Sequence, residues 1–354
     1  MTAAAWRGPA AVASFADGPV GMEGTRDVRG PGRVRRTAQA CAAALALFAA
    51  GACAAYPEKP VRLVIPFSPG GGTDLVARVL AQKFTEQTGA QVVFDNRPGA
   101  NGAIAGELVA RATPDGYKLL LSSGANVAIN TAIYGAKLPF DVVRDLVPVT
   151  EVVSQSFVAH VSPNYEVKSI KDLIALAKTK PGVINYASAG TGSTAHMLAA
   201  LFASMTATQF THIPYKGAPQ GRVAVMAREC DFMFDGLLAT LPLFRAGKLR
   251  ALGVTGAKRS TVAPEIPTIA EEGVRGYNGD AWYALFAPRG TPPAIVNKLN
   301  SVVVQALQNP DRRNKLQAQG VEIVGSTQEA LGVFLKAEIE KWRRVSKEAG
   351  IKPD

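Results

Sequence analysis

Cysteine and histidine are scarce in this chain of 354 residues, with three of each. Beyond the N-terminal leader proposed below only one cysteine remains, Cys230, which lies in an apolar segment and is expected to be a small buried side chain. A disulfide framework is therefore excluded, and hydrophobic burial has to stabilise the fold. The histidines at positions 160, 196 and 212 have the spacing of neither a zinc site nor a catalytic set.

Two enzyme motifs are incomplete. Gly70 and Gly72 fit the start of a dinucleotide-binding pattern, and Asp95 lies at about the right distance, but Leu75 occupies the third glycine position. The glycine-containing loops do not form the Gly-x-Ser-x-Gly turn of a hydrolase. The chain is therefore expected not to be an enzyme, and neither a cofactor nor a metal is expected.

Apolar runs are too short to span a membrane, which takes about 20 residues. Residues 33–36 read Arg-Val-Arg-Arg, an Ala-rich apolar stretch follows at 40–50, and Ala52-Cys53-Ala54 supplies a small-residue cleavage site. This order predicts a leader and signal peptide over 1–55, cleaved near Ala54 and Ala55.

Two details of the leader stay open. Lipid attachment at Cys53 is the less favoured alternative, because Ala50 stands where such signals usually have leucine. Residues 1–30 have no signal character, so translation could begin at Met22 or later.

Basic residues exceed acidic ones, giving a net charge of +11. The leader carries six Lys/Arg and three Asp/Glu, so the mature chain has a net charge of +8. These charges are scattered, with no basic run interleaved with aromatic residues, so nucleic acid is not expected as a partner. A surface of this kind attracts small anions.

Short apolar segments alternate with amphipathic ones along the mature chain. This rhythm predicts an α/β fold with mainly parallel sheets flanked by helices. The expected strands lie at 59–67, 91–97, 117–123, 156–163, 183–189, 211–216, 231–236 and 248–256. The expected helices lie at 74–88, 102–112, 170–180, 193–205, 221–228, 292–307, 312–319 and 328–349.

A glycine-rich loop joins the first strand to the first helix. Glycine lets the backbone approach a ligand closely, and a helix N-terminus adds unpaired N–H donors with partial positive charge. Such a loop predicts a carboxylate or phosphate site, although Thr73 or Asp74 could also cap the helix. The expected contacts are Phe67, Ser68, Gly70, Gly71, Gly72, Thr73 and Asp74.

Several segments together resemble one family of receptors. They include VRLVIPFSPGGGTDLVAR from residue 61, DNRPGANG from 95, ATPDGYKLLL from 112, NYASAGTGSTAHM from 185 and AGKLRALGVTGAKR from 246. In this order they resemble the Bug proteins, the periplasmic solute receptors of tripartite tricarboxylate transport systems. The resemblance runs from Tyr56 nearly to the C-terminus.

The resemblance implies a two-domain periplasmic binding protein, type II-like, that closes on a small carboxylate in the cleft between its domains. The chain would cross between the domains near Gln155 and Asp280. The first domain then combines residues 56–155 with 281–354, and the second spans 156–280. The implied protein is a periplasmic monomer that delivers a small organic acid to the membrane components of a tripartite transporter. The alternative is a sensor that signals to a membrane partner without transport.

Two further loops are expected to line the cleft. The loop at 122–126 follows a strand end, where ligands bind in open α/β sheets, and contributes Ser123 and Asn126; an ordinary polar loop is its alternative. A second-domain loop mirrors the first glycine loop across the cleft and contributes Gly190, Thr191, Gly192, Ser193 and Thr194. Gly72 and Gly192 are expected to let the backbone approach the ligand from opposite sides.

Side chains near the second loop have two interpretations each. Asp235 is expected at the cleft rim, where it either accepts from the ligand or bonds backbone donors. Gly236 follows it where the family often has asparagine, and Arg222 lies in a stretch that is usually apolar, so it is either a surface residue or a cleft residue that alters specificity. His196, in the first turn of a helix, is expected to be neutral and structural.

Overall fold

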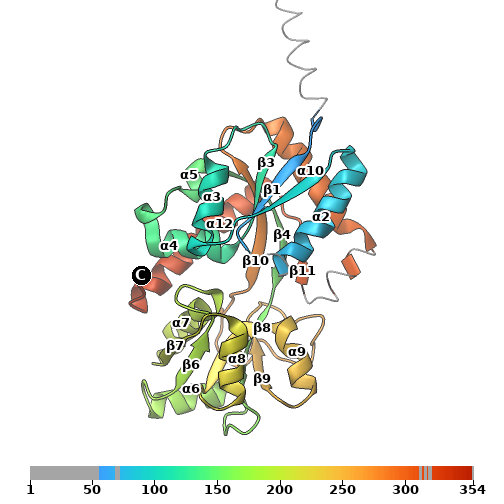
Figure 1. The fold of residues 1–354 in the computed structure, drawn as a ribbon. Coiled ribbons are helices and arrows are strands. Elements are labelled where there is room, and N and C mark those ends of the chain that lie inside the picture. Colours follow the sequence, from blue (N-terminus) through green and yellow to red (C-terminus); the bar gives the residue numbers. More distant parts are fainter. Residues whose placement is uncertain (1–55, 68–71, 311–312, 315–316, 318–320, 353–354) are drawn as a thin grey trace, which may run out of the picture. The chain divides into compact units, whose positions relative to one another are not determined.

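The strands in the described part of the chain form two sheets (Figure 1). The computed structural model describes residues 56–67, 72–310, 313–314, 317 and 321–352; the predicted leader at 1–55 and its cleavage and lipidation sites lie outside the described residues. The first sheet contains β1 (Val61–Ile65), β2 (Val92–Asn96), β3 (Lys118–Ser123), β4 (Leu146–Gln155), β10 (Ala281–Pro288) and β11 (Val321–Ile323). The second contains β5 (Phe157–Val161), β6 (Asn185–Ser188), β7 (Thr211–Pro214), β8 (Phe232–Gly236) and β9 (Arg250–Val254).

Both sheets are mixed. The strand orders are β11-β4-β10-β3-β1-β2 and β7-β6-β8-β5-β9. β1 is parallel to β2 and β3, and β6 is parallel to β7 and β8, while β4, β5, β9, β10 and β11 pair antiparallel with their neighbours. The predicted α/β fold is confirmed, with mixed rather than mainly parallel sheets. The antiparallel pairs arise largely where the chain leaves one sheet for the other and later returns in the opposite direction.

The chain changes sheet at two places. β4 ends the first passage at Gln155 and β5 begins two residues later, and the return occurs between β9 and β10. These changes of sheet describe strand pairing and do not define domains. The predicted domain limits near Gln155 and Asp280 therefore stay a prediction.

Helices cover both sheets. They are α2 (Gly72–Thr88), η1 (Ala100–Gly102), α3 (Ala103–Ala110), η2 (Ala125–Ile129), α4 (Asn130–Tyr134), η3 (Gly135–Lys137), α5 (Val142–Asp145), α6 (Ile170–Thr179), α7 (Thr194–Thr206), α8 (Ala218–Met226), α9 (Leu237–Arg245), α10 (Pro293–Gln308) and α12 (Gln328–Glu348). The helices α2, α3, α6, α7, α8, α10 and α12 lie within a few residues of the expected ranges, whereas α4, α5, α9 and the short η helices were not expected. The expected helix at 312–319 falls mostly outside the described residues.

Strand β1 shows how the first sheet builds two layers. Alternate side chains point to opposite faces of a strand. Leu63 and Ile65 belong to one hydrophobic cluster together with residues of α2 and α10, whereas Val64 belongs to another together with residues of α3 and α12. Because helices pack on both faces of β1, its segment is an almost continuous apolar run.

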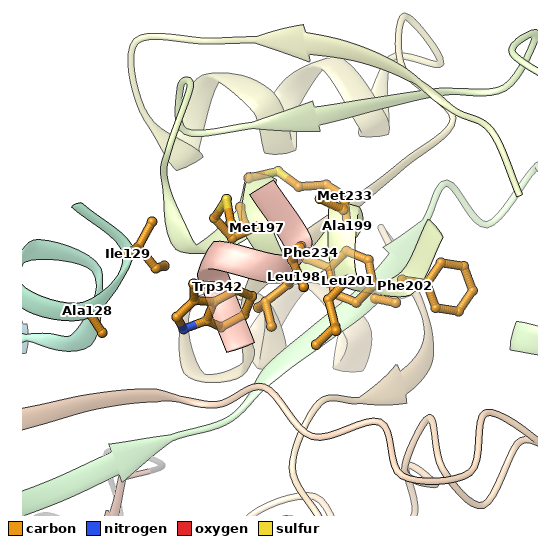
Figure 2. Close-up of a cluster of buried hydrophobic side chains, with 14 of the residues drawn as sticks. Ala128, Ile129, Met197, Leu198, Ala199, Leu201, Phe202, Met233, Phe234 and Trp342 are labelled. Carbon is orange, nitrogen blue, oxygen red and sulfur yellow. The ribbon is translucent and has the colours of Figure 1, made fainter. Parts of the chain in front are cut away.

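The C-terminal helix α12 contacts helices from both sheets: η2 and α4, which come after β3, and α7, which comes after β6. Thr327 caps it, because the Thr327 hydroxyl accepts a hydrogen bond from the Ala330 N–H at 3.2 Å. Its buried side chains, among them Leu335 and Trp342, recur at helical spacing and pack against η2, α4 and α7. Figure 2 shows Trp342 in one cluster with Ile129 of η2 and side chains of α7.

Candidate ligand site

The carboxyl ends of the parallel strands of the first sheet meet at one edge. There the Phe67 carbonyl accepts a hydrogen bond from Asn96 Nδ2 at 2.9 Å, which links the ends of β1 and β2. Helix α2 begins at Gly72, so a helix follows the first glycine loop as predicted. Of the predicted contacts, Ser68, Gly70 and Gly71 lie outside the described residues. For Thr73 and Asp74 the backbone is described but the side chains are not.

The predicted residues after β3 form a network around Asn101. Ser123 Oγ donates to Asn126 Oδ1 at 2.7 Å, and Asn126 Nδ2 donates to the Asn101 carbonyl at 2.7 Å. Asn130 Nδ2 donates to the same carbonyl at 2.6 Å. Ser123 and Asn126 are buried, so their side chains fix the turn at Asn101, and direct ligand contact by either stays a prediction.

Asn101 was not predicted as a site residue. Its φ is +51°, in the left-handed region that asparagine tolerates better than most residues. The Asn101-Gly102 pair was a turn signal in the sequence. Its partners lie 25 and 29 residues away, so no local pattern revealed the network.

The second glycine loop faces this turn from the other sheet. A Cβ atom built on Gly192 would lie 3.6 Å from Ile133 Cδ1 and 3.8 Å from Asn101 Nδ2. Both neighbours belong to the part of the chain that forms the first sheet. The structure therefore brings Gly192 close to segments that follow β2 and β3, whereas the predicted pairing of its loop with the first glycine loop stays a prediction.

The loop after β6 uses most of its N–H groups internally. The Gly190 N–H donates to Ser188 Oγ at 3.0 Å, and the Gly192 N–H donates to His196 Nδ1 at 3.1 Å. The Ser193 N–H donates to the Gly190 carbonyl, and Ser193 Oγ caps α7 by accepting from the His196 N–H at 3.3 Å. The Ser193 side chain therefore caps α7, and its contact with a ligand stays a prediction.

Two threonines of this loop remain accessible. Thr191 is exposed, and within the described residues neither its N–H nor its hydroxyl has a partner. Thr194 begins α7 and is half-buried. Thr191 and the first turn of α7 are therefore the groups of this loop that are free to meet an anion.

A stacked pair of histidines lies behind the loop. The rings of His196 and His212 are parallel within 9°, with centroids 3.9 Å apart, and Tyr186 stacks on His212 at 4.9 Å. Burial lowers the pKa of each imidazole to about 4, and His212 adds to the effect on His196. His196 is consequently neutral at pH 7, in agreement with the sequence, and its free Nδ1 lone pair holds the Gly192 N–H.

Asp235 has partners within the protein. Its Oδ2 accepts from Arg222 Nε at 2.7 Å, and its Oδ1 accepts from the Gly236 N–H at 2.7 Å. Burial raises the pKa of the Asp235 carboxyl, while Arg222 and the Gly236 N–H oppose that shift. His160 Nε2 lies 4.0 Å from Asp235, and burial lowers the pKa of that imidazole to about 3. The Gly236 N–H is a backbone donor, as one of the two interpretations requires, and acceptance from a ligand stays a prediction.

Carboxyl groups gather where the chain crosses between sheets. Glu151 of β4, Asp280 before β10 and Glu338 of α12 line one cavity of about 320 Å³, together with Lys341 and Lys258. Burial, reinforced by Glu338 and Asp280, raises the pKa of Glu151 to about 7. Burial also raises the pKa of Asp280 to about 6, although the Thr255 and Ser156 hydroxyls oppose it.

This cluster makes stability depend on pH. The Glu151 carboxyl ionises near pH 4.5 when unfolded and near pH 7 when folded, so the folded state holds an extra proton in between and loses stability as the pH rises through that range. Glu151→Gln removes this loss. We expect the stability of the variant relative to wild type to rise by about 2–3 kcal/mol between pH 5 and pH 8, measured by urea unfolding.

The matched control for this experiment is Glu265→Gln, because Glu265 is exposed. Its difference from wild type should not change between pH 5 and pH 8. A constant difference for Glu151→Gln over the same range would show that Glu151 is ionised throughout.

Among the described residues, no three His, Cys, Asp or Glu side chains are grouped to hold a metal ion. The same part of the chain contains no helix both long and apolar enough to cross a membrane.

Comparison with known proteins gives a consistent match. The family model of the tripartite tricarboxylate transporter family receptor matches residues 76–351. Protein BugT of Bordetella pertussis is 37% identical over 298 residues, which are 84% of this chain and 91% of BugT.

Solved structures agree with this match. A Rhodopseudomonas palustris protein solved with adipate is 36% identical, with a TM-score of 0.74 and coverage of 84% of this chain and 100% of that one. MatC from the same species, with bound malate, is 29% identical, with a TM-score of 0.70 and coverage of 82% and 99%. The periplasmic binding protein BugD is 30% identical, with a TM-score of 0.70 and coverage of 84% and 100%.

These matches span most of both chains, and the family and fold are those of periplasmic solute receptors and not of enzymes. Membership in a periplasmic binding protein family implies a periplasmic location. The chain belongs to the receptor family of the tripartite tricarboxylate transporters, the Bug proteins.

Proposed function

We propose that this receptor binds a small carboxylate in a cleft between two domains and delivers it to the membrane components of a tripartite transporter. The domains would be residues 56–155 with 281–354, and residues 156–280. The observation that carries the proposal is the approach of Gly192 to Asn101 and Ile133, because a glycine loop of one sheet there meets the segments that follow β2 and β3 of the other. The relatives solved with adipate and malate support the ligand class.

The proposed chemistry depends on backbone donors. Two helices, α2 and α7, begin directly after glycine loops at strand ends, and each helix N-terminus carries partial positive charge. Thr191 adds a free N–H and a hydroxyl. A carboxylate group is the small anion that such donors hold through charge-assisted hydrogen bonds. The net charge of the mature chain also favours an anionic ligand.

Delivery to a transporter requires export. We propose signal-peptide cleavage just before Ala55 or Tyr56, from the order of basic, apolar and small residues in the leader. N-terminal sequencing of the exported protein identifies its first residue, and a soluble exported form that retains residues 33–50 would contradict the proposal.

We expect at least one small organic acid to raise the melting temperature. A ligand that binds only the folded state stabilises it by about 2.7 kcal/mol at 100 times its dissociation constant. For a protein of this size that corresponds to a shift of several degrees, at roughly 2–4 °C per kcal/mol. A thermal-shift screen that includes adipate and malate tests this, with NAD and nucleotides as controls. Stabilisation by the controls alone would refute the carboxylate proposal.

A further inference from the structure

The Arg222 guanidinium is bound to the protein by only one of its three nitrogens. Nε donates to Asp235 Oδ2 at 2.7 Å, whereas Nη1 and Nη2 donate to no group in the described part of the chain. Neither terminal nitrogen is a buried atom without a partner, so both reach solvent. The side chain of Arg222 is 16% exposed, against 4% for Asp235. Asp235 therefore fixes a guanidinium whose outer edge remains open.

The position of α8 places Arg222 at the edge of the second sheet where the candidate loop lies. Gly221 fixes the helix on its sheet, because a Cβ there would lie 3.2 Å from Ala187 Cβ and 3.1 Å from Met233 Sδ. Side chains of a helix tilt toward its N-terminus, and α8 begins beside the carboxyl ends of β6 and β7. Arg222 accordingly reaches along β8 to Asp235 at the strand end, at the same edge as the second glycine loop.

The groups left free at this point are donors. Both oxygens of Asp235 are occupied, by Arg222 and by the Gly236 N–H. The Nη atoms of arginine donate hydrogen bonds and accept none. An anionic group is the chemical complement of this corner.

We propose that Arg222, oriented by Asp235, determines specificity by binding a second acidic group of the ligand. This inference rests on the proposed function, in which the glycine loops bind the first carboxylate. The ligand is then a dicarboxylate, held at one end by backbone donors and at the other by the guanidinium. A planar guanidinium already fixed through Nε loses little freedom when its Nη atoms bind a carboxylate.

Arg222→Gln tests the proposal through a ratio of affinities. Calorimetry compares acids of equal chain length that carry two carboxylates or one: adipate with hexanoate, and succinate with butyrate. Wild type should prefer the dicarboxylate of a pair by at least about tenfold, because the second carboxylate gains charge-assisted hydrogen bonds. Arg222→Gln should abolish most of that preference and leave the affinity for the monocarboxylate nearly unchanged.

The matched control is Arg228→Gln. Arg228 follows the same helix but pairs with Asp231 at 3.7 Å and lies over the Tyr165 ring, away from Asp235. It should keep the wild-type preference. Equal weakening of both acids in Arg222→Gln would mean that Arg222 only supports the fold, and an unchanged preference would mean that it does not contact the ligand; either result overturns the proposal.

Asp235→Asn separates the two members of the pair. If Arg222 served only to neutralise Asp235, both substitutions would disturb the site alike. Under the proposal they differ, because Asp235→Asn keeps the charged guanidinium on α8, with one side-chain oxygen still able to accept from Nε, and removes a competing negative charge. The preference for dicarboxylates should therefore persist or increase in Asp235→Asn. Its loss in both variants would contradict a direct contact.

Sulfate provides a test that does not depend on the proposed function. Titration of wild type with sulfate should shift the side-chain ¹⁵Nη resonances of Arg222, assigned by their absence in Arg222→Gln. No shift would refute an open anion-binding edge, whatever acids bind elsewhere. Conversely, a sulfate shift in a protein for which the thermal-shift screen finds no organic acid would refute the proposed carboxylate receptor and leave the anion-binding edge standing.

Discussion

Replacement of Trp342 by alanine should lower the free energy of unfolding by about 3–5 kcal/mol, the usual cost of removing a large buried aromatic side chain. Trp342 is 2% exposed and lies on α12. Figure 2 shows its ring in the cluster that contains Ile129 of η2 and Met197 and Leu198 of α7. The substitution would leave a cavity between η2, which comes after a strand of the first sheet, and α7, which comes after a strand of the second. No single element can therefore relax to fill it.

A hydrogen bond from the indole nitrogen of Trp342 adds to the expected loss of stability. Trp342 Nε1 donates to Glu338 Oε2 at 2.9 Å, and Trp282 Nε1 donates to the same oxygen at 3.2 Å. Glu338 is 6% exposed, so losing one of these donors leaves a buried carboxylate less well satisfied. Trp342→Phe loses this hydrogen bond but keeps most of the packing, and should cost clearly less than Trp342→Ala.

Urea unfolding measures both effects. Val333→Ala is the control on the same helix, because Val333 is 71% exposed and should change stability by less than about 0.5 kcal/mol. A loss below about 1 kcal/mol for Trp342→Ala would show that α12 is not firmly packed on α7 and η2.

How far the sequence predicts the fold depends on whether the signal is local. Helix α12 was expected at 328–349 and is observed at Gln328–Glu348, because its cap and its apolar spacing are both local. Helix α8 was expected from Gly221 but begins at Ala218. Pro219 explains the difference, since proline is favoured in the first turn, where its missing N–H has no cost.

Prediction of the site met the same limit. The position of the glycine loops follows from strand, loop and helix order, which the sequence contains. The partners of the loop groups do not: Asp235 pairs with Arg222, 13 residues earlier, and the Gly192 N–H is held by a histidine expected only to be structural. Such pairs depend on how α8 and α7 lie on the sheet, and packing decides this.

The substitution Gly192→Val should weaken binding of the small acid at least tenfold, about 1.4 kcal/mol, and should lower stability by about 1–3 kcal/mol. Gly192 has φ of +74°, a conformation that a β-branched residue adopts only with strain. Its Cβ would already contact Ile133 and Asn101, so the methyl groups of valine would occupy the space between the two loops. The N–H bond to His196 Nδ1 would be disturbed as well.

Gly247→Val separates strain from position. Gly247 has a similar φ of +65°, and a Cβ there would meet no atom within 4 Å. It should therefore lose stability by a similar backbone strain and keep the wild-type affinity for the acid found by thermal shift. Calorimetry on the two variants decides the matter, because only a loop that faces the ligand can lose affinity beyond what strain alone costs. Wild-type affinity in Gly192→Val would place the carboxylate site away from this loop, and the facing glycine loops would then be structural turns.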